Sequence, residues 1–158
     1  MVIADQGEID VRPISVRDAG EILTIQRAAF VSEARIYGDP DMPVLTQTLE
    51  ELEAELANTD GWVAVEGARV VGAIRSRESD NLLLIGRIAI APDKQGAGIG
   101  RRLLETAEQH SHAAEAELFT GSESAANIRL YASCGYVESE RIDHGDGTAQ
   151  IFMRKTLR

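Results

Sequence analysis

Three alternate glycines, Gly96, Gly98 and Gly100, stand between an apolar segment and an amphipathic segment. Glycine adopts positive φ without strain and has no Cβ, so a turn built from it can approach another molecule closely. The first N–H groups of a helix that follows such a turn have no intrahelical partner, and the helix dipole places partial positive charge there. Phosphate is the ligand that suits this arrangement. The sequence therefore predicts an anion-binding turn at residues 95–101.

Several designs of glycine-rich turn compete at this position. A P-loop needs Lys and Ser or Thr after its last glycine, whereas Gly100 is followed by Arg101 and Arg102. A dinucleotide fingerprint needs its third glycine at position 101, one residue after Gly100. Glycines can also serve only the tight packing of a strand against a helix. The spacing that remains is Q-x-x-G-x-G, formed by Gln95, Gly98 and Gly100.

Three segments carry a family resemblance. The stretch RIAIAPDKQGAGIG, residues 87–100, resembles the acetyl-CoA pyrophosphate loop of the GCN5-related N-acetyltransferase (GNAT) superfamily. The stretch ANIRLYASCGY, residues 126–136, resembles its second cofactor motif, and IFMRKTL, residues 151–157, is similar to its usual last strand. The resemblance covers nearly the whole chain and is most specific from residue 84 to 137. It implies direct transfer of acetyl from acetyl-CoA to a primary amine.

This reaction sets three chemical requirements. The amine, with a pKa of about 10, must become neutral before it attacks. The carbonyl oxygen needs a preorganised hydrogen-bond donor as charge develops on it. The thiolate, whose parent pKa is about 8.5, leaves best when it is protonated. A phenol stays protonated at neutral pH, so Tyr131 is the candidate catalytic acid; the resemblance implies that this tyrosine contacts the cofactor sulfur.

The resemblance also implies the cofactor contacts. Asn127, one helical turn before Tyr131, would hydrogen-bond the cofactor. The strand before the glycines would splay from its parallel neighbour and offer main-chain groups to pantetheine and acetyl, with the Ile90 N–H nearest the carbonyl. The residues of that strand are Ile88, Ala89 and Ile90. Those that would bind the pyrophosphate are Gln95, Gly96, Ala97, Gly98, Ile99, Gly100 and Arg101.

No general base is assigned from the sequence. Some family members carry a glutamate on the central strand, but residues 82–91 contain no carboxylate. Glu33, Asp39 and Asp41 are the acids near the segment where the family binds its acceptor. A water chain to one of them, or no base, stays open. A non-catalytic acyl-CoA-binding or sensing module is therefore the alternative function.

The histidines and the cysteine receive no role in the chemistry. His110 and His112 are two residues apart on a predicted helix and point away from each other, so no metal site is expected. His144 lies in DHGDGT, which is typical of a hairpin turn. Cys134 is expected to be a small buried hydrophobe, and a single cysteine excludes an intrachain disulfide.

Periodicity and turn residues predict the elements that must position these residues. The predicted order is β-α-α-β-β-β-α-β-α-β-β, a mixed α/β sheet with helices on its faces. The resemblance implies one domain over residues 1–158, a mostly antiparallel sheet with a splayed parallel pair, and about four helices. The predicted segments are a strand at 9–14, a helix starting at a Ser15–Asp18 capping box, an irregular segment at 37–46, a helix carrying Leu45 to Leu56, a hairpin at 61–77, a strand at 81–92, a helix from Ile99, a strand at 116–120, a helix at 123–135, and a hairpin of 136–142 and 149–155.

Composition limits the partners. The net charge of -10 argues against nucleic acid and favours a cationic amine acceptor, either a small molecule or a protein. The longest apolar run, Leu82–Ile85, is too short for a membrane span. The first ten residues have no basic and apolar export signal, so we expect a cytoplasmic protein. A homodimer is common in the family, although no residue here specifies an interface.

Overall fold

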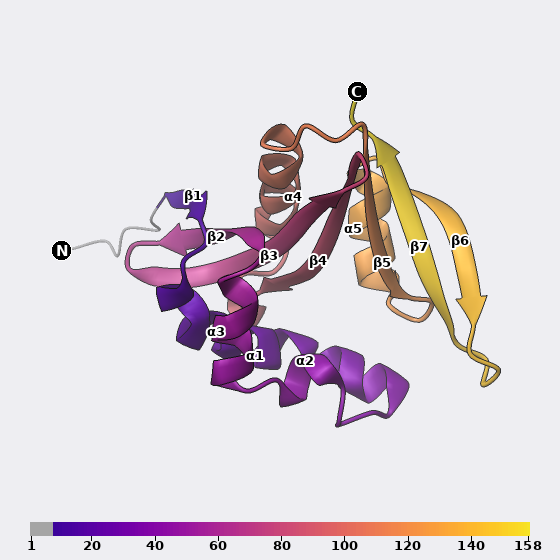
Figure 1. The fold of residues 1–158 in the computed structure, drawn as a ribbon. Helices are drawn as coiled ribbons and strands as arrows, with labels where there is room; N and C mark the ends of the chain where they lie inside the picture. Colours follow the sequence, from indigo (N-terminus) through magenta and orange to yellow (C-terminus); the bar gives the residue numbers. More distant parts are fainter. Residues whose placement is uncertain (1–7) are drawn as a thin grey trace.

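All seven strands that the structure describes lie in one sheet, in the order β1-β2-β3-β4-β5-β7-β6 (Figure 1). The computed structural model describes residues 8–158; residues 1–7, which carry part of the argument against an export signal, lie outside the described residues. The strands are β1 (Ile9–Pro13), β2 (Asp60–Glu66), β3 (Arg69–Ser79), β4 (Leu82–Ile90), β5 (Glu115–Gly121), β6 (Val137–Asp143) and β7 (Ala149–Thr156).

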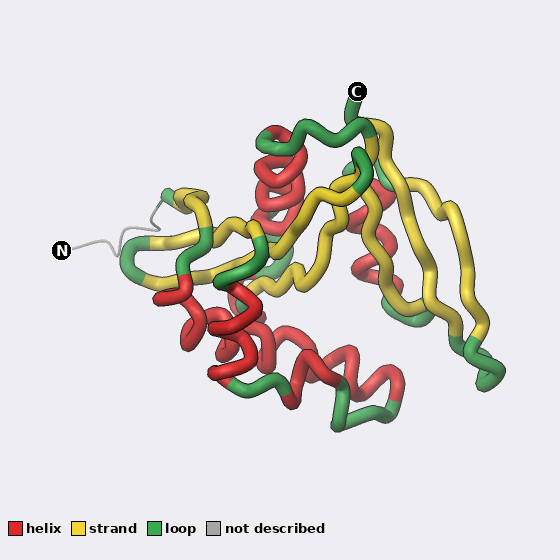
Figure 2. Tube along the Cα trace, in the orientation of Figure 1, coloured by secondary structure: helices red, strands yellow, loops and turns green. Residues whose placement is uncertain are grey.

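The parallel pair β4–β5 separates soon after it begins. Residues Leu82–Leu84 pair with Glu115–Glu117, and no further β4–β5 pair follows in the described sheet. The remaining neighbours pair in antiparallel fashion. The two strands diverge along the rest of their length, as the tube in Figure 2 shows. The mixed, mostly antiparallel sheet with one splayed parallel pair is thus confirmed.

The helices cover the two faces of the sheet. They are α1 (Ala19–Tyr37), α2 (Pro43–Thr46), α3 (Leu49–Leu56), α4 (Ile99–Gln109) and α5 (Ala125–Ser133), with short 3₁₀ turns η1 (Val16–Asp18) and η2 (Pro92–Lys94). Gly72 of β3 packs against Ile99 of α4 on one face. Arg75 of the same strand points to α1 and α3 on the other face. None of the helices in residues 8–158 is long and apolar enough to cross a membrane.

The structure corrects the prediction between α1 and α3. The segment 37–46 is not irregular throughout, because Tyr37 ends α1 and Pro43–Thr46 form α2. Leu45 belongs to α2 rather than to the next helix, so five α-helices are described instead of about four. Proline suits the first position of a helix because its φ is already helical. The predicted Ser15–Asp18 capping box is present, and Thr48 caps α3 in the same way with Glu51.

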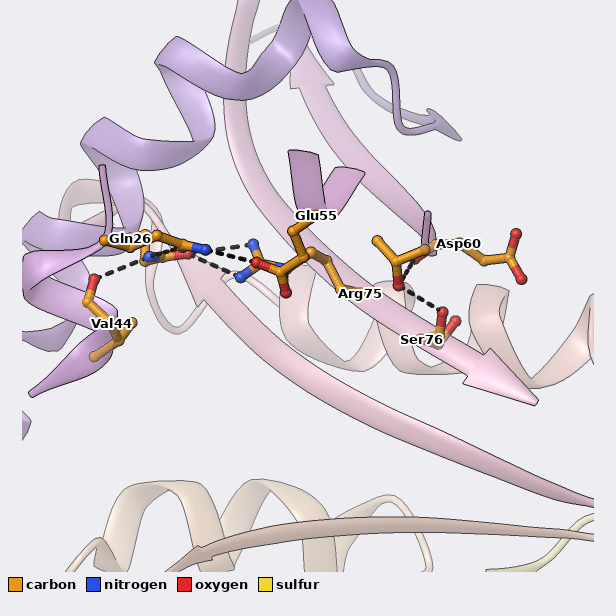
Figure 3. A network of polar contacts seen from close by, with 8 residues as sticks. Gln26, Val44, Glu55, Asp60, Arg75 and Ser76 are labelled. Carbon is orange, nitrogen blue, oxygen red and sulfur yellow. Dashed lines mark hydrogen bonds and ion pairs between the residues drawn. The ribbon is translucent and has the colours of Figure 1, made fainter. Parts of the chain in front are cut away.

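A buried polar network fixes α2 against the sheet (Figure 3). Arg75, only 3% exposed, donates to Glu55 Oε1 at 3.0 Å and to Gln26 Oε1 at 3.2 Å. Gln26 Nε2 in turn donates to the Val44 carbonyl at 2.9 Å. Buried polar groups with all their partners present hold one arrangement of the elements that carry them. This network therefore sets the position of α2 relative to β3, α1 and α3.

Candidate active site

A cleft of about 770 Å³ opens where β4 and β5 diverge. Its walls are residues 85–88 of β4, residues 118–121 of β5, the C-terminal half of α1, the α2 segment, one side of α5 and the β6–β7 turn. Ile88, Asn127 and Tyr131 line this cleft, which brings three of the predicted site residues together. Ala89 is buried, while the 95–101 turn lies at the start of α4 and does not line the cleft.

Tyr131 faces the cleft with its hydroxyl. The side chain is 8% exposed, and none of the described residues hydrogen-bonds to its hydroxyl. Within residues 8–158, every side-chain N or O that is fully buried has a hydrogen-bond partner. The Tyr131 hydroxyl has none, so it is not fully buried and reaches the surface of the cleft. Burial raises the pKa of Tyr131 well above its usual value, and the charge of Glu33 raises it further. The phenol therefore stays protonated across the pH range in which an enzyme works.

A hydrogen-bonded chain beside Tyr131 holds the Glu33 carboxylate. Ser124 Oγ donates to Glu33 Oε2 at 2.5 Å, and Asn127 Nδ2 donates to Glu33 Oε1 at 3.3 Å. The Tyr37 hydroxyl accepts from the Glu123 N–H, so it is free to donate to Ser124 Oγ at 2.8 Å. Two of the five residues are on α1 and the others begin or precede α5. The chain therefore ties a carboxylate from α1 to the helix that carries Tyr131.

Gly121 makes this contact between α1 and α5 possible. The Tyr37 hydroxyl lies 2.0 Å from the place that a Cβ on Gly121 would occupy. Any other residue at this position would displace the Tyr37 ring, because this distance is shorter than any real contact between heavy atoms that are not bonded. The absence of a side chain at Gly121 is thus part of what places Tyr37 next to Ser124.

The main chain of Ile90 points into the space left by the splay. The Ala91 N–H donates to the Val71 carbonyl at 2.9 Å, so Ala91 faces β3. Ala89 opposes Ala73 and faces β3 as well, because bonded residues alternate along an antiparallel ladder. The N–H and C=O of Ile90 lie between them and point the opposite way, toward the side from which β5 has diverged. The N–H is available to a ligand that lies between the two strands, whereas the carbonyl accepts a hydrogen bond from Gln95 Nε2 at 3.4 Å.

The three alternate glycines have two different functions. Gly96 and Gly98 have φ of +82°, and no atom lies within 4 Å of the Cβ that either would carry. Gly98 is the N-cap of α4 and provides no side-chain hydrogen bond to its first N–H groups. Gly100 instead faces α5, where a Cβ would lie 3.0 Å from Leu130 Cδ2. The first two glycines leave an open, uncapped helix start, whereas the third serves helix packing.

The polar side chains of this turn are directed to protein atoms. Gln95 Nε2 donates to the Ile90 carbonyl at 3.4 Å. Arg101 donates to the carbonyl and the hydroxyl of Ser133, at 3.3 and 2.9 Å. Ile99 is buried in the core and Ala97 is exposed. The turn therefore offers an anion mainly its backbone N–H groups, which suits the positive end of the α4 dipole.

We expect Gly98→Ala to raise the Kd for acetyl-CoA about tenfold, since a left-handed alanine is strained by about 1–2 kcal/mol and its methyl would occupy the open side of the turn. Gly100→Ala should change this Kd far less, because its φ is ordinary and only the end of Leu130 has to move. Calorimetric titration of both variants measures the difference. Equal losses of affinity would show that positive φ is not what the turn requires.

Several residues of the cleft are absent from the sequence-based candidates. Tyr37, Ser124 and Arg87 line it, and so do His144 and Asp146 from the β6–β7 turn. His144 lies in the turn where the sequence places it, but that turn also forms a wall of the cleft. Arg87 begins the stretch RIAIAPDKQGAGIG, but the resemblance assigns only main-chain roles to that strand. No local motif marks the other four residues, which come from segments far apart in the chain.

The fold agrees with comparisons to known proteins. Residues 40–157 match the acetyltransferase (GNAT) domain family, and the chain belongs to this family of N-acetyltransferases. The crystal structure of PaiA N-acetyltransferase from Thermoplasma acidophilum in complex with coenzyme A superposes with a TM-score of 0.78 at 18% identity, covering 94% of this chain and 99% of that chain. The structure of yncA from Salmonella typhimurium with acetyl-CoA gives a TM-score of 0.73 at 23% identity, covering 96% and 95%.

A curated relative in Bacillus subtilis (strain 168), named UPF0157 protein YqkA, is 28% identical over 130 residues. These residues are 82% of this chain and 37% of that protein, so the chain spans well under half of its length. The two solved structures contain coenzyme A and acetyl-CoA, respectively. The open turn at Gly96 and Gly98, the uncapped start of α4 and the outward Ile90 peptide fit an extended molecule with a phosphate group.

Proposed function

We propose that the protein transfers acetyl directly from acetyl-CoA to a primary amine on a cationic acceptor. The observation that carries the proposal is the meeting of a protonated phenol, Tyr131, and a carboxylate, Glu33, in the cleft between the splayed strands. The further acids Asp39 and Asp146 line the same cleft, and the chain has a net charge of -10. This negative environment favours an acceptor whose amine is protonated in solution.

Acetyl-CoA supplies an activated acetyl group: its C–S bond breaks as a C–N bond forms to the amine. Ile90 would donate its outward N–H to the carbonyl oxygen, where charge develops. Ile88 and Ala89 would continue this edge of β4, and Asn127 would offer its amide from α5. The turn of Gln95, Gly96, Ala97, Gly98, Ile99, Gly100 and Arg101 would hold the pyrophosphate, largely through its N–H groups.

Two side chains would move the protons. Glu33 would hold the ammonium group of the acceptor and take a proton from it, since the carboxylate lies in the cleft and is fixed by Ser124 and Asn127. Tyr131 would give its proton to the departing sulfur, since its raised pKa keeps the proton on the phenol until a thiolate forms. An ammonium acceptor loses two protons on its way to the amide. Glu33 would take the first and pass it to solvent, and the second leaves the nitrogen as the C–N bond forms and replaces the proton that Tyr131 gives to the sulfur. Each turnover therefore releases one proton to solvent.

Calorimetric titration with acetyl-CoA, followed by a panel of primary amines with free thiol monitored, tests the proposal. The expected result is binding of acetyl-CoA followed by thiol release with one class of amine. Binding without thiol release from any amine would contradict an enzyme and support an acyl-CoA sensor. The absence of binding would contradict the role of the 95–101 turn.

A further inference from the structure

Arg87 occupies a bulge in β4. Ala73 pairs with Ala89 and Arg75 with Gly86, so two β4 residues, Arg87 and Ile88, lie opposite one residue of β3. Arg87 has a φ of +52°, in the left-handed region that side chains other than Asn and Asp rarely adopt. Glycine is the residue typical of a left-handed bulge position. A strained non-glycine residue at a bulge beside a cleft is a feature of functional sites.

The Arg87 guanidinium has no partner among residues 8–158. The side chain is half-buried and lines the cleft, and no hydrogen bond or ion pair joins it to the described residues. Arg75 lies close enough for the charge of Arg87 to affect its pKa. Burial lowers the pKa of Arg75, the charge of Glu55 raises it, and the charge of Arg87 lowers it. Glu55 already pairs with Arg75 at 3.0 Å. This wall of the cleft therefore carries positive charge for which the described residues provide no direct partner.

The other charged walls of the cleft are mostly negative. Glu33 lies on α1, Asp39 follows this helix, and Asp146 lies in the β6–β7 turn next to His144. A cleft with carboxylates on some walls and a guanidinium on another is complementary to a molecule that carries both charges.

We propose that Arg87 binds a carboxylate of the acceptor, and that the acceptor is an amino acid or a close analogue with ammonium and carboxylate groups. This inference rests on the proposed function and narrows its substrate class. A guanidinium pairs with a carboxylate through two parallel N–H···O bonds, which gives both affinity and orientation. The amine of such an acceptor then faces the carboxylate walls, where Glu33 is located.

The cofactor phosphate is a less suitable partner for Arg87. The guanidinium lies near Arg75, whose contacts are with Gln26 of α1 and Glu55 of α3. The glycine turn leads instead into α4, which packs on the opposite face of the sheet against Gly72. Arg87 therefore lies near the face of the sheet that α1 and α3 cover, opposite the face on which the predicted pyrophosphate site leads into α4.

Replacement of Arg87 by glycine separates the side chain from the backbone. Glycine suits the φ of +52°, so Arg87→Gly is expected to unfold no more easily than the parent protein. Acceptors are tested in matched pairs, each amino acid beside the amine that remains when its carboxylate is removed, such as lysine and 1,5-diaminopentane. The ratio of kcat/KM for the two members should fall roughly 10- to 100-fold, the value of a lost charge-assisted hydrogen bond.

Arg77→Gln is the control for a change of net charge. Arg77 is an exposed arginine of β3 that does not line the cleft, so this variant should keep the parental ratio. Arg87→Lys keeps the charge but loses the planar pair of donors, and we expect an intermediate ratio. A parent protein with no preference for the carboxylated member of any pair overturns the proposal. A higher Kd for acetyl-CoA in Arg87→Gly than in the parent protein also overturns the proposal, because it would assign the arginine to the cofactor.

A binding measurement distinguishes this inference from the proposed function. Amino acids are titrated calorimetrically into the protein saturated with CoA, where no reaction takes place. Binding that disappears in Arg87→Gly supports the carboxylate site even if no amine releases thiol from acetyl-CoA. Turnover of amines with no effect of Arg87→Gly on either ratio or binding supports the proposed function and overturns the carboxylate site.

Discussion

Tyr131→Phe is expected to lower kcat for acetyl transfer by roughly 10²- to 10³-fold, the usual contribution of a positioned general acid. The variant removes only the hydroxyl, and the ring keeps its edge-on contact with Tyr136 at 6.4 Å between centroids. Because no described residue hydrogen-bonds to this hydroxyl, its loss leaves no buried group without a partner. The free energy of unfolding and the Kd for acetyl-CoA should therefore stay near their parental values.

Tyr136→Phe is the matched control for Tyr131→Phe. The Tyr136 hydroxyl donates to Glu108 Oε2 at 2.8 Å, on the α4 side of the site. Its removal should lower the free energy of unfolding by about 1.5–3 kcal/mol, the range for a hydrogen bond to a charged group, with kcat retained. Urea unfolding and steady-state thiol release measure the two quantities. Similar kcat values for Tyr131→Phe and the parent protein at every pH would exclude Tyr131 as the acid.

The raised pKa of Tyr131 also sets a pH dependence. The phenol must be protonated to act, and its folded pKa lies well above the ordinary value of about 10. Ionisation of Tyr131 should therefore cause no fall in kcat up to about pH 10. The folded state keeps a proton that the unfolded chain releases, so this group stabilises the fold below about pH 10 and loses this contribution as pH rises further. Tyr131→Phe should lack that part of the alkaline loss of stability.

The parts of the site that the sequence predicts are local. The Q-x-x-G-x-G turn depends on consecutive residues, and Asn127 and Tyr131 share a helix face because they are four residues apart. The Ser15 capping box likewise involves residues within one turn. Such features follow from the geometry of a single element, so their residue types and spacing are sufficient to identify them.

The parts that the sequence does not predict depend on distant pairings. Ser124 and Glu33 are 91 residues apart, and their contact requires α1 to lie across the start of α5. The bulge at Arg87 depends on the register between β3 and β4, which the apolar β4 sequence leaves undefined. The sequence identifies Glu33 as one of three available acids, but only the folded chain brings it beside Tyr131 and Asn127.

Glu33→Gln is expected to lower kcat/KM for the acceptor amine by roughly 10²-fold at neutral pH, because the amide has no charge and takes no proton. The side chain keeps its size, and its carbonyl oxygen can still accept from Ser124, so the helix contact should persist. The loss should shrink as pH rises toward about 10, where the free amine becomes abundant without a base. Steady-state thiol release as a function of pH measures this dependence, which a purely structural role would not produce.

Glu123→Gln provides the control because it removes a carboxylate one residue from Ser124. Glu123 is exposed and does not line the cleft, and it contacts Tyr37 through its main-chain N–H, which the substitution retains. Its kcat/KM should equal the parental value throughout the pH range. A Glu33→Gln loss that is constant with pH and accompanied by a lower urea midpoint would make Glu33 a structural residue. A loss that is large at neutral pH and shrinks toward about pH 10, with the midpoint retained, places the acceptor's proton on Glu33 and gives α1 a direct part in catalysis.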